Sequence, residues 1–264
     1  MFEQITPILL TLNEAPNLGR TLERLYWARD IVVVDSFSED ATVSIAWSFG
    51  QVRVFQRKFD GMANQWNFAM RETGIKTEWV LALDADYVLT EGFVEELREL
   101  RPDSDTAGYR CAFTYCVRGR PLRASLYPPV VVLFRRASAS YAQDGHTQRV
   151  VVRGRVGTLR SKVRHDDRKP LMCWIVAQHG YMALEAEKLS RTGWANLGWP
   201  DRLRKLVMIA PQVAFLHCLL IKGGLWDGWP GLYYALQRMF AETLLSLRLL
   251  ERHLRLESPD QFHS

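Results

Sequence analysis

Two aspartates one residue apart, Asp84 and Asp86, are the side chains of this sequence with the clearest chemical potential. They follow an apolar run over residues 78–83 that is typical of a buried strand. Open α/β sheets bind ligands at the carboxyl ends of their strands, so both carboxylates are expected in a crevice. Close carboxylates repel each other and favour a divalent cation, and their hard oxygen atoms suit Mg²⁺ or Mn²⁺. A metal held there can neutralise a departing diphosphate.

The first hundred residues contain the elements that would position this pair, because strand-like and helix-like patterns alternate along them. Apolar and β-branched runs predict strands at residues 5–12, 31–35, 52–55 and 78–83. Periodic apolar positions and capping residues predict helices at residues 13–28, 38–49 and 64–73. Alternation of this kind is typical of an α/β fold in which helices flank a mostly parallel sheet.

The rest of the chain changes character twice. Strand-like runs predict an antiparallel or mixed extension of the sheet at residues 109–117, 129–135, 150–152 and 156–159. From about residue 171 the pattern becomes helical and amphipathic. We therefore expect one α/β domain over residues 1–190 and a C-terminal helical region over residues 191–264.

One segment of the helical region has features that are typical of contact with a bilayer surface. Residues 206–221 are uncharged, but a helix of that length spans ~24 Å and falls short of a ~30 Å hydrocarbon core. Pro211 and His217 also interrupt it. Basic residues precede the segment, and Trp226 and Trp229 follow it, as is favoured at a membrane interface. An interfacial or re-entrant segment is therefore expected rather than a full crossing.

The last helix, predicted over residues 231–257, repeats this theme. Its apolar side chains lie on one stripe and its arginines lie mainly off that stripe. Basic amphipathic helices of this kind are typical of anionic membrane surfaces. Packing of both segments on the protein's own core is the alternative.

Composition and charge exclude two classes of protein. The chain has 264 residues, of which 48% are hydrophobic and 24% charged, so a packed core is feasible and global disorder is excluded. The net charge of +5 is spread without a dense basic run, and no nucleic-acid-binding motif occurs, so no nucleic-acid partner is expected. The four cysteines form no CxxC pair, and no secretory signal is apparent at the N-terminus. Free thiols in a reducing cytoplasm are therefore expected.

Four stretches give the chain a resemblance to a known family through their order and spacing. They are residues 11–14 with Asn17 and Leu18, residues 31–36 with Asp40, residues 65–69, and residues 81–86. This combination is similar to family 2 glycosyltransferases, which have a GT-A (Rossmann-like) fold, and among them to bacterial lipopolysaccharide core β-glucosyltransferases. Weaker similarity continues through residues 133–136, 144–146, 165–168 and 224–228.

The resemblance implies that residues 1–190 are a catalytic domain for a nucleotide-diphosphate sugar, with UDP as the expected carrier. The residues that it assigns to the nucleotide sugar are Thr11, Asn13, Glu14, Asp35, Asn67, Asp84 and Arg168. Glu14 and Asp35 end the first two strands, where carboxylates can accept hydrogen bonds from uracil-type N–H groups and ribose hydroxyls. The resemblance also implies that Asp86 and His165 bind the expected cofactor, Mg²⁺ or Mn²⁺.

An inverting transfer, which the resemblance also implies, needs a base that deprotonates the acceptor hydroxyl. Asp144 and His146 are the two candidates, because Thr147 stands where the core transferases carry a glutamate after a histidine. Arg149 joins Arg168 as a candidate phosphate contact. The expected acceptor is a lipid-linked or cell-envelope saccharide. We expect the protein to act as a peripheral protein on the cytoplasmic face of the inner membrane.

Two other functions fit part of the sequence. Residues 84–88 match the DxDxV pattern of haloacid-dehalogenase-type phosphatases. That family has its nucleophilic aspartate after its first strand, whereas three strand–helix units precede Asp84 here. The other alternative is a non-catalytic membrane scaffold that keeps the nucleotide-binding sheet, and the presence of Asp84, Asp86 and His165 argues against it.

Overall fold

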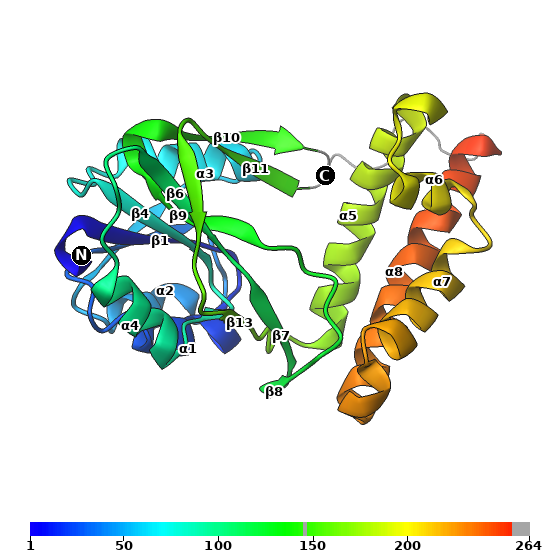
Figure 1. Cartoon of the computed structure of the whole chain (residues 1–264), viewed down its shortest axis with the longest axis horizontal. Coiled ribbons are helices and arrows are strands. Elements are labelled where there is room, and N and C mark those ends of the chain that lie inside the picture. Colours follow the sequence, from blue (N-terminus) through cyan, green and yellow to red (C-terminus); the bar gives the residue numbers. More distant parts are fainter. Residues whose placement is uncertain (145–146, 255–264) are drawn as a thin grey trace. The chain divides into compact units, whose positions relative to one another are not determined.

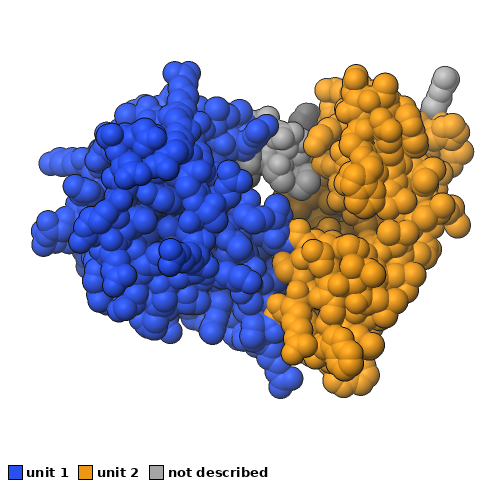
Figure 2. All heavy atoms as spheres, in the orientation of Figure 1, with its two compact units in different colours: residues 1–121, 127–169 blue, residues 122–126, 170–264 orange. Residues whose placement is uncertain are grey.

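A computed structural model describes residues 1–144 and 147–254 of the chain, and for residues 143, 144, 147 and 148 it describes the main chain alone (Figure 1). The chain divides into two compact units (Figure 2). Unit 1 comprises Met1–Pro121 and Tyr127–Lys169, and unit 2 comprises Leu122–Leu126 and Pro170–Ser264. Each unit is described by itself below.

Unit 1 is built on a seven-stranded sheet with the strand order β12-β6-β9-β4-β1-β2-β3. The strands are β1 (Ile5–Thr11), β2 (Ile31–Asp35), β3 (Val52–Gln56), β4 (Trp79–Asp84), β6 (Thr106–Cys111), β9 (Val130–Arg135) and β12 (Arg155–Thr158). Only β9 runs antiparallel to its neighbours, β4 and β6, and the other neighbouring pairs are parallel. The predicted mostly parallel sheet is confirmed.

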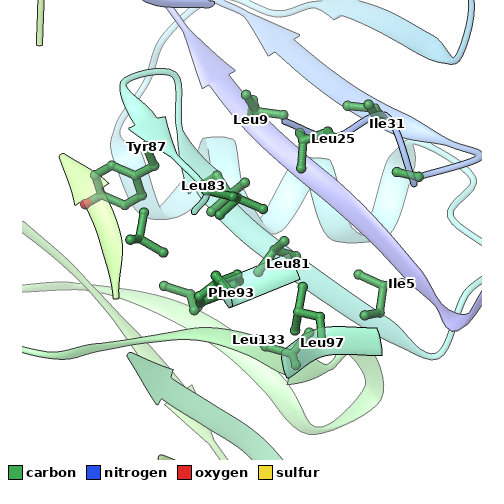
Figure 3. Close-up of a cluster of buried hydrophobic side chains, with 14 of the residues drawn as sticks. Ile5, Leu9, Leu25, Ile31, Leu81, Leu83, Tyr87, Phe93, Leu97 and Leu133 are labelled. Carbon is green, nitrogen blue, oxygen red and sulfur yellow. The ribbon is translucent and has the colours of Figure 1, made fainter. Parts of the chain in front are cut away.

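Helices cover both faces of this sheet. They are α1 (Ala15–Glu23), α2 (Thr42–Trp47), α3 (Met62–Glu72) and α4 (Glu91–Glu99). Buried side chains of α1, α2 and α4 pack on one face, and those of α3 pack on the other. Figure 3 shows the first of these clusters, which includes Leu25, Leu81 and Phe93. Along β2, Val33 faces that cluster while Val32 and Val34 face α3, which explains why the strand has no polar interruption.

The middle of the chain adds two smaller sheets, as the strand-like runs predicted. One has the order β5-β13-β7-β8, and its strands are Tyr87–Val88, Val163–His165, Phe113–Val117 and Arg120–Pro121 respectively. The other is a hairpin of β10 (Ala139–Asp144) and β11 (Thr147–Val152), which packs with α3. The run at residues 109–117 thus divides between β6 and β7, which belong to different sheets. A short helical turn, η2 (Arg136–Ser138), joins β9 to β10, and another, η1 (Phe2–Gln4), precedes β1.

Two predicted helices are shorter than expected. The helix predicted over residues 13–28 ends at Glu23, because Arg24, Leu25 and Ala28 continue in tight turns that donate to carbonyls three residues back. The helix predicted from residue 38 begins at Thr42. Its start is delayed because the Asp40 carboxylate accepts the Thr42 main-chain N–H at 2.9 Å and holds residues 40–42 in a turn.

Unit 2 is helical, which confirms the predicted C-terminal extension. Its helices are α5 (Leu171–Arg191), α6 (Trp199–Lys205), α7 (Ala210–Leu216) and α8 (Trp229–His253), with short turns η3 (Trp194–Asn196), η4 (His217–Ile221) and η5 (Gly224–Asp227). A small core joins α5 to α8 through Met182, Ala186, Leu189, Leu197 and Leu245. Among the described residues, no helix has both the length and the apolar run that crossing a bilayer requires.

A five-residue strap from the middle of the chain, Leu122–Leu126, also belongs to unit 2. The Asp227 carboxylate accepts the main-chain N–H groups of Arg123 at 2.8 Å and Ala124 at 3.1 Å. The Tyr234 hydroxyl accepts the main-chain N–H of Leu126 at 3.0 Å. Unit 2 is therefore discontinuous in sequence.

The predicted boundary between residues 190 and 191 falls near the end of α5, whereas the compact units divide just before that helix begins. The division does not test what the two parts do. The assignment of residues 1–190 to catalysis and residues 191–264 to the membrane surface stays a prediction.

Candidate active site

The sheet has a topological switch point between β1 and β4. After β1 the chain adds β2 and then β3 on one side, and β4 returns to the other side of β1. Asp84 at the end of β4 lies beside Leu10, and Thr11 lies beside Asp35. Open sheets bind ligands at the carboxyl ends of the strands where the order reverses. The predicted site residues of β1, β2 and β4 therefore share one edge of the sheet.

Pairing of β5 with β13 brings Asp86 and His165 together. His165 is in register with Tyr87, and the main-chain N–H of Asp166 donates to the carbonyl of Asp86 at 3.0 Å. His165 Nε2 then lies 3.0 Å from Asp86 Oδ2. The predicted metal ligands are thus neighbours, although 79 positions separate them in the sequence.

The surroundings of Asp84 and Asp86 shift the pKa values of their carboxyl groups in opposite directions. Burial and the nearby charge of Asp86 raise the pKa of Asp84 to about 6. Burial alone would raise the pKa of Asp86 as well, but the charge and hydrogen bond of His165 hold it below its usual value. Burial would lower the pKa of His165, and the charge of Asp86 instead raises it. Asp86 is therefore the carboxylate that stays ionised across the physiological range.

The side chains of Asp86 and His165 are of the types that bind a divalent cation. Among the described residues, Asp86 Oδ1 and His165 Nδ1 are buried polar atoms without a hydrogen-bond partner. In the structure Nε2 and Oδ2 contact each other directly at 3.0 Å, so a cation bound between them would replace this contact. The described part of the chain holds no group of three His, Cys, Asp or Glu side chains that could complete a metal cage. An ion bound here would take its further ligands from water and phosphate, as Mg²⁺ commonly does.

Three tyrosines fix the imidazole of His165. The rings of Tyr87, Tyr115 and Tyr127 meet it edge to face, with centroids 5.2, 5.0 and 4.9 Å away. The hydroxyls of Tyr87 and Tyr127 are hydrogen-bonded to each other. This surround restricts the orientation of the ring.

A half-buried ion pair that the sequence analysis missed lies beside the aspartates. Lys169 Nζ donates to Glu14 Oε1 at 2.6 Å, and Asn17 Nδ2 donates to Glu14 Oε2 at 2.8 Å. The charge of the Lys169 ammonium lowers the pKa of both Asp84 and Asp86. Asn17 was visible as a polar residue next to Leu18 on the buried side of a predicted helix. Lys169 had no signal of its own beyond following Arg168.

Glu14 gives a testable pH dependence of stability. Burial raises its pKa to about 7 despite Lys169, so the folded chain keeps a proton that the unfolded chain releases near pH 4.5. The free energy of unfolding therefore falls as pH rises from about 4.5 to 7, by up to about 3 kcal/mol from this group. We expect Glu14→Gln to remove this contribution in urea unfolding at pH 5 and pH 7.5 without ligand. Glu95→Gln, at an exposed position of α4, is the control, and an unchanged pH dependence in Glu14→Gln would contradict the assignment.

The loop from His165 to Lys169 is anchored on α1. The buried Asp166 carboxylate accepts from Arg20 at 2.9 Å and from Arg168 at 2.8 to 3.0 Å. Asn17 Nδ2 also donates to Asp167 at 2.8 Å, and Asn17 Oδ1 accepts the Arg168 main-chain N–H at 2.8 Å. Arg168 is thus paired with Asp166, and its assignment to phosphate stays a prediction.

The other predicted nucleotide-binding residues also have protein partners. Asp35 is fully buried and accepts from Thr11 Oγ1 at 2.9 Å and from the Ser38 main-chain N–H at 2.8 Å. Asn13, in the left-handed region with φ 53°, accepts the Glu39 main-chain N–H at 2.9 Å. These contacts connect the loops after β1 and β2, so both residues shape the rim of the site. Their contact with a nucleotide stays a prediction.

Asn67 holds the β10–β11 hairpin. Its side-chain amide donates to the Tyr141 carbonyl at 2.9 Å and accepts the Tyr141 main-chain N–H at 3.0 Å. The rings of Trp66 and Tyr141 stack with centroids 5.2 Å apart. Both polar groups of the Asn67 amide thus bond to the main chain of the hairpin.

One of the two candidate bases, Asp144, belongs to this hairpin. The main chain of Asp144 ends β10 and faces Thr147, but its side chain is not described. His146 lies outside the described residues. Arg149 is an exposed residue of β11. The choice between Asp144 and His146 therefore stays open.

The chain is similar to known proteins over most of its length. The model of glycosyl transferase family 2 matches residues 7–160. The lipopolysaccharide core biosynthesis glycosyltransferase LpsC of Rhizobium meliloti (strain 1021) is 28% identical over 94% of this chain and 93% of that protein. An uncharacterized glycosyltransferase of Rickettsia bellii (strain RML369-C) is 35% identical over 36% of this chain and 32% of its own length. A crystal structure of S. aureus TarS 1–349 in complex with UDP-GlcNAc covers 96% of this chain and 92% of that chain, at 14% identity and a TM-score of 0.47.

Proposed function

Since the chain belongs to glycosyl transferase family 2 and is a glycosyltransferase, we propose that it transfers a hexose from a UDP-sugar to a lipid-linked or cell-envelope saccharide. The name of LpsC, a relative over nearly the whole length of both chains, supports an acceptor of the lipopolysaccharide core type. The UDP carrier and the inverting course follow the family resemblance. Family membership excludes the haloacid-dehalogenase-type alternative.

One observation carries this proposal. Asp84, Asp86, His165, Glu14 and Lys169 come from three separate stretches of the chain and meet at the switch point of the sheet. Each acidic group there lies close to a cation or to a second acid. Such an arrangement suits a ligand that carries both hydroxyls and a diphosphate.

The residues present suggest a division of roles. Asp86 and His165 would hold Mg²⁺ or Mn²⁺, which would offset the negative charge that develops on the departing diphosphate. Lys169 adds a fixed positive charge on the same side of the site. Asp84 and Glu14, with raised pKa values, can donate or accept hydrogen bonds at the sugar and the nucleoside. Asp144 or His146 would remove the acceptor proton.

A thermal-shift measurement tests the donor and Lys169 together. We expect UDP to raise the melting temperature of the wild-type protein strongly with Mn²⁺ and weakly without it. Lys169→Met should weaken UDP binding on the order of tenfold to a hundredfold, because it removes a half-buried positive charge from the proposed diphosphate site. Lys162→Met, which removes an exposed lysine of unit 1, is the control and should bind UDP normally.

The competing functions predict other results. A phosphatase would turn over simple phosphomonoesters, and a non-catalytic scaffold would hydrolyse no nucleotide sugar at all. No change in melting temperature with UDP and Mn²⁺ would contradict the proposed donor site. Equal loss of UDP binding in Lys162→Met and Lys169→Met would contradict the role of Lys169.

We also propose that the enzyme works as a peripheral protein on the cytoplasmic face of the inner membrane. A lipid-linked acceptor keeps its lipid in the bilayer, so the enzyme must reach the membrane surface to meet it. In this proposal residues 1–190 carry out the transfer and residues 191–264 make the membrane contact.

A further inference from the structure

Helix α8 has its large apolar side chains on the outside. The face that it buries within unit 2 is made largely of small or polar residues: Gly231, Tyr234, Ala235, Ala241, Glu242, Leu245 and Ser246. Its exposed side chains include Trp229, Leu236, Phe240, Leu247 and Leu250. A helix at the surface of a water-soluble domain normally shows the reverse pattern. The large apolar side chains of α8 are thus turned away from the small core of unit 2, whereas packing of this stripe on the protein's own core is the alternative.

The segment from α7 to η5 shows the same pattern. Ile209, Val213, Leu216 and Leu220 follow one another at intervals of four, three and four residues, which places them on one side of a helix. All four are exposed, and Ile221 at the end of η4 is 75% exposed. Trp226 and Trp229 continue this surface at 77% and 83% exposure. We call these exposed apolar side chains, together with those of α8 named above, the apolar face of unit 2.

A cluster of charged side chains lies inside unit 2 in addition to its small apolar core. Arg204 lies between the buried carboxylates of Glu242 and Glu185, at 3.1 and 3.4 Å. Burial opposes the charge on Arg204, and Glu242 raises the pKa of the guanidinium enough to keep it. A buried ion cluster together with exposed leucines suits a unit whose surroundings are apolar on one side.

Basic side chains and tryptophans gather at the edge of the apolar face. Gly223 lies between Arg123 and Trp226, and the exposed Lys222 precedes it. Within residues 122–126 and 170–254 the chain has ten Lys and Arg against six Asp and Glu. This combination is complementary to the surface of an anionic bilayer, which has an apolar interior and negatively charged headgroups. Tryptophans are favoured at the boundary between these two layers.

We propose that the apolar face of unit 2 inserts into the interfacial layer of an anionic lipid bilayer. The α7 and η4 stripe and the outer side of α8 enter the boundary of the acyl chains, while Trp226, Arg123 and Lys222 lie at the headgroups. A shallow groove of about 280 Å³, lined by Leu219, Leu225, Gly228, Trp229 and Leu232, offers a place for part of one acyl chain. Insertion stays interfacial because α7 and η4 together span only about 18 Å. The inference deepens the proposed location at the membrane and does not require the transfer reaction.

Flotation of the full chain with lipid vesicles tests the proposal. The vesicles contain phosphatidylcholine with about 30% phosphatidylglycerol, and pure phosphatidylcholine vesicles are run in parallel. Trp229→Glu should lower the partition coefficient at least on the order of tenfold, because it places a charge in the apolar face. Trp47→Glu is the matched control, since Trp47 is an exposed tryptophan of α2 in unit 1, and it should bind as wild type. Pure phosphatidylcholine should bind the wild type more weakly.

A second readout separates insertion from loss of folding. Brominated lipids should quench part of the tryptophan fluorescence of the wild-type protein. The quenched fraction should be smaller in the double variant Trp226→Phe, Trp229→Phe. The UDP-induced rise in melting temperature should be the same in Trp229→Glu and wild type, so failure of the donor site is recognised independently. Unchanged vesicle binding in Trp229→Glu, or equal loss in Trp47→Glu, overturns the proposal. A third outcome would also overturn it: the wild-type protein forms a dimer in lipid-free solution, Trp229→Glu dissociates this dimer, and the dimer does not bind vesicles.

Discussion

Replacing Asp86 with alanine is expected to lower the rate of sugar transfer by about three orders of magnitude while the chain stays folded. Asp86 is the carboxylate that His165 keeps ionised, and it offers a buried oxygen without a partner in the described structure. Its loss would leave His165 as the only proposed protein ligand of the cation. The negative charge on the departing diphosphate would then be largely uncompensated. Losses of charge stabilisation of that kind commonly lower the rate by a factor of 10²–10³ or more.

The measurement should separate chemistry from folding. For each variant, three quantities are measured. They are the turnover of the UDP-sugar, the free energy of unfolding in urea, and the additional rise in melting temperature that Mn²⁺ gives in the presence of UDP. Asp86→Ala should lose both turnover and the Mn²⁺-dependent part of the rise. Asp103→Ala, which removes an exposed carboxylate of unit 1, should lose neither. Near-normal turnover in Asp86→Ala would rule out the metal role of this residue.

Asp144→Asn is expected to lower transfer by about 10²–10⁴-fold and leave UDP binding unchanged. Asp144 ends β10, and Asn67 and Trp66 of α3 hold this strand at Tyr141. An amide keeps the size of the carboxylate but cannot take the acceptor proton. Loss of transfer with normal UDP binding is therefore the signature of a base.

The outcome also decides between the two candidates. A fully active Asp144→Asn variant would contradict this assignment and make His146 the base, and His146→Asn would then show the loss. A variant that loses UDP binding as well would mean that residue 144 shapes the donor site instead.

Much of the sheet could be predicted from the sequence because its signals are local. The uninterrupted run of residues 31–35 implied a strand covered on both faces, and Val32, Val33 and Val34 are buried in that way. Asp84 follows its apolar strand directly, so its position at the carboxyl edge needed no long-range information. The order of strands and helices then fixed the mostly parallel arrangement.

The rest of the site depends on contacts between distant parts of the chain. His165 reaches Asp86 only because β13 pairs with β5, and the family resemblance alone pointed to it. Lys169 was missed because its partner, Glu14, is 155 residues away. Helical periodicity predicted an apolar stripe on the last helix, but it could not show that the small residues of α8 would be buried and the large ones exposed.

The strap held by Asp227 and Tyr234 has a practical consequence for dissecting this enzyme. Cutting the chain after Lys169 would remove α5 to α8 but leave behind the strap, whose Leu122 and Ala124 would lose the neighbours that cover them. Its main-chain N–H groups would also lose the Asp227 acceptor. Aggregation of such a truncated protein would therefore be explained by the exposed strap. It would not show that unit 1 is unable to fold by itself. A sound design shortens residues 122–126 to a polar linker in the same step.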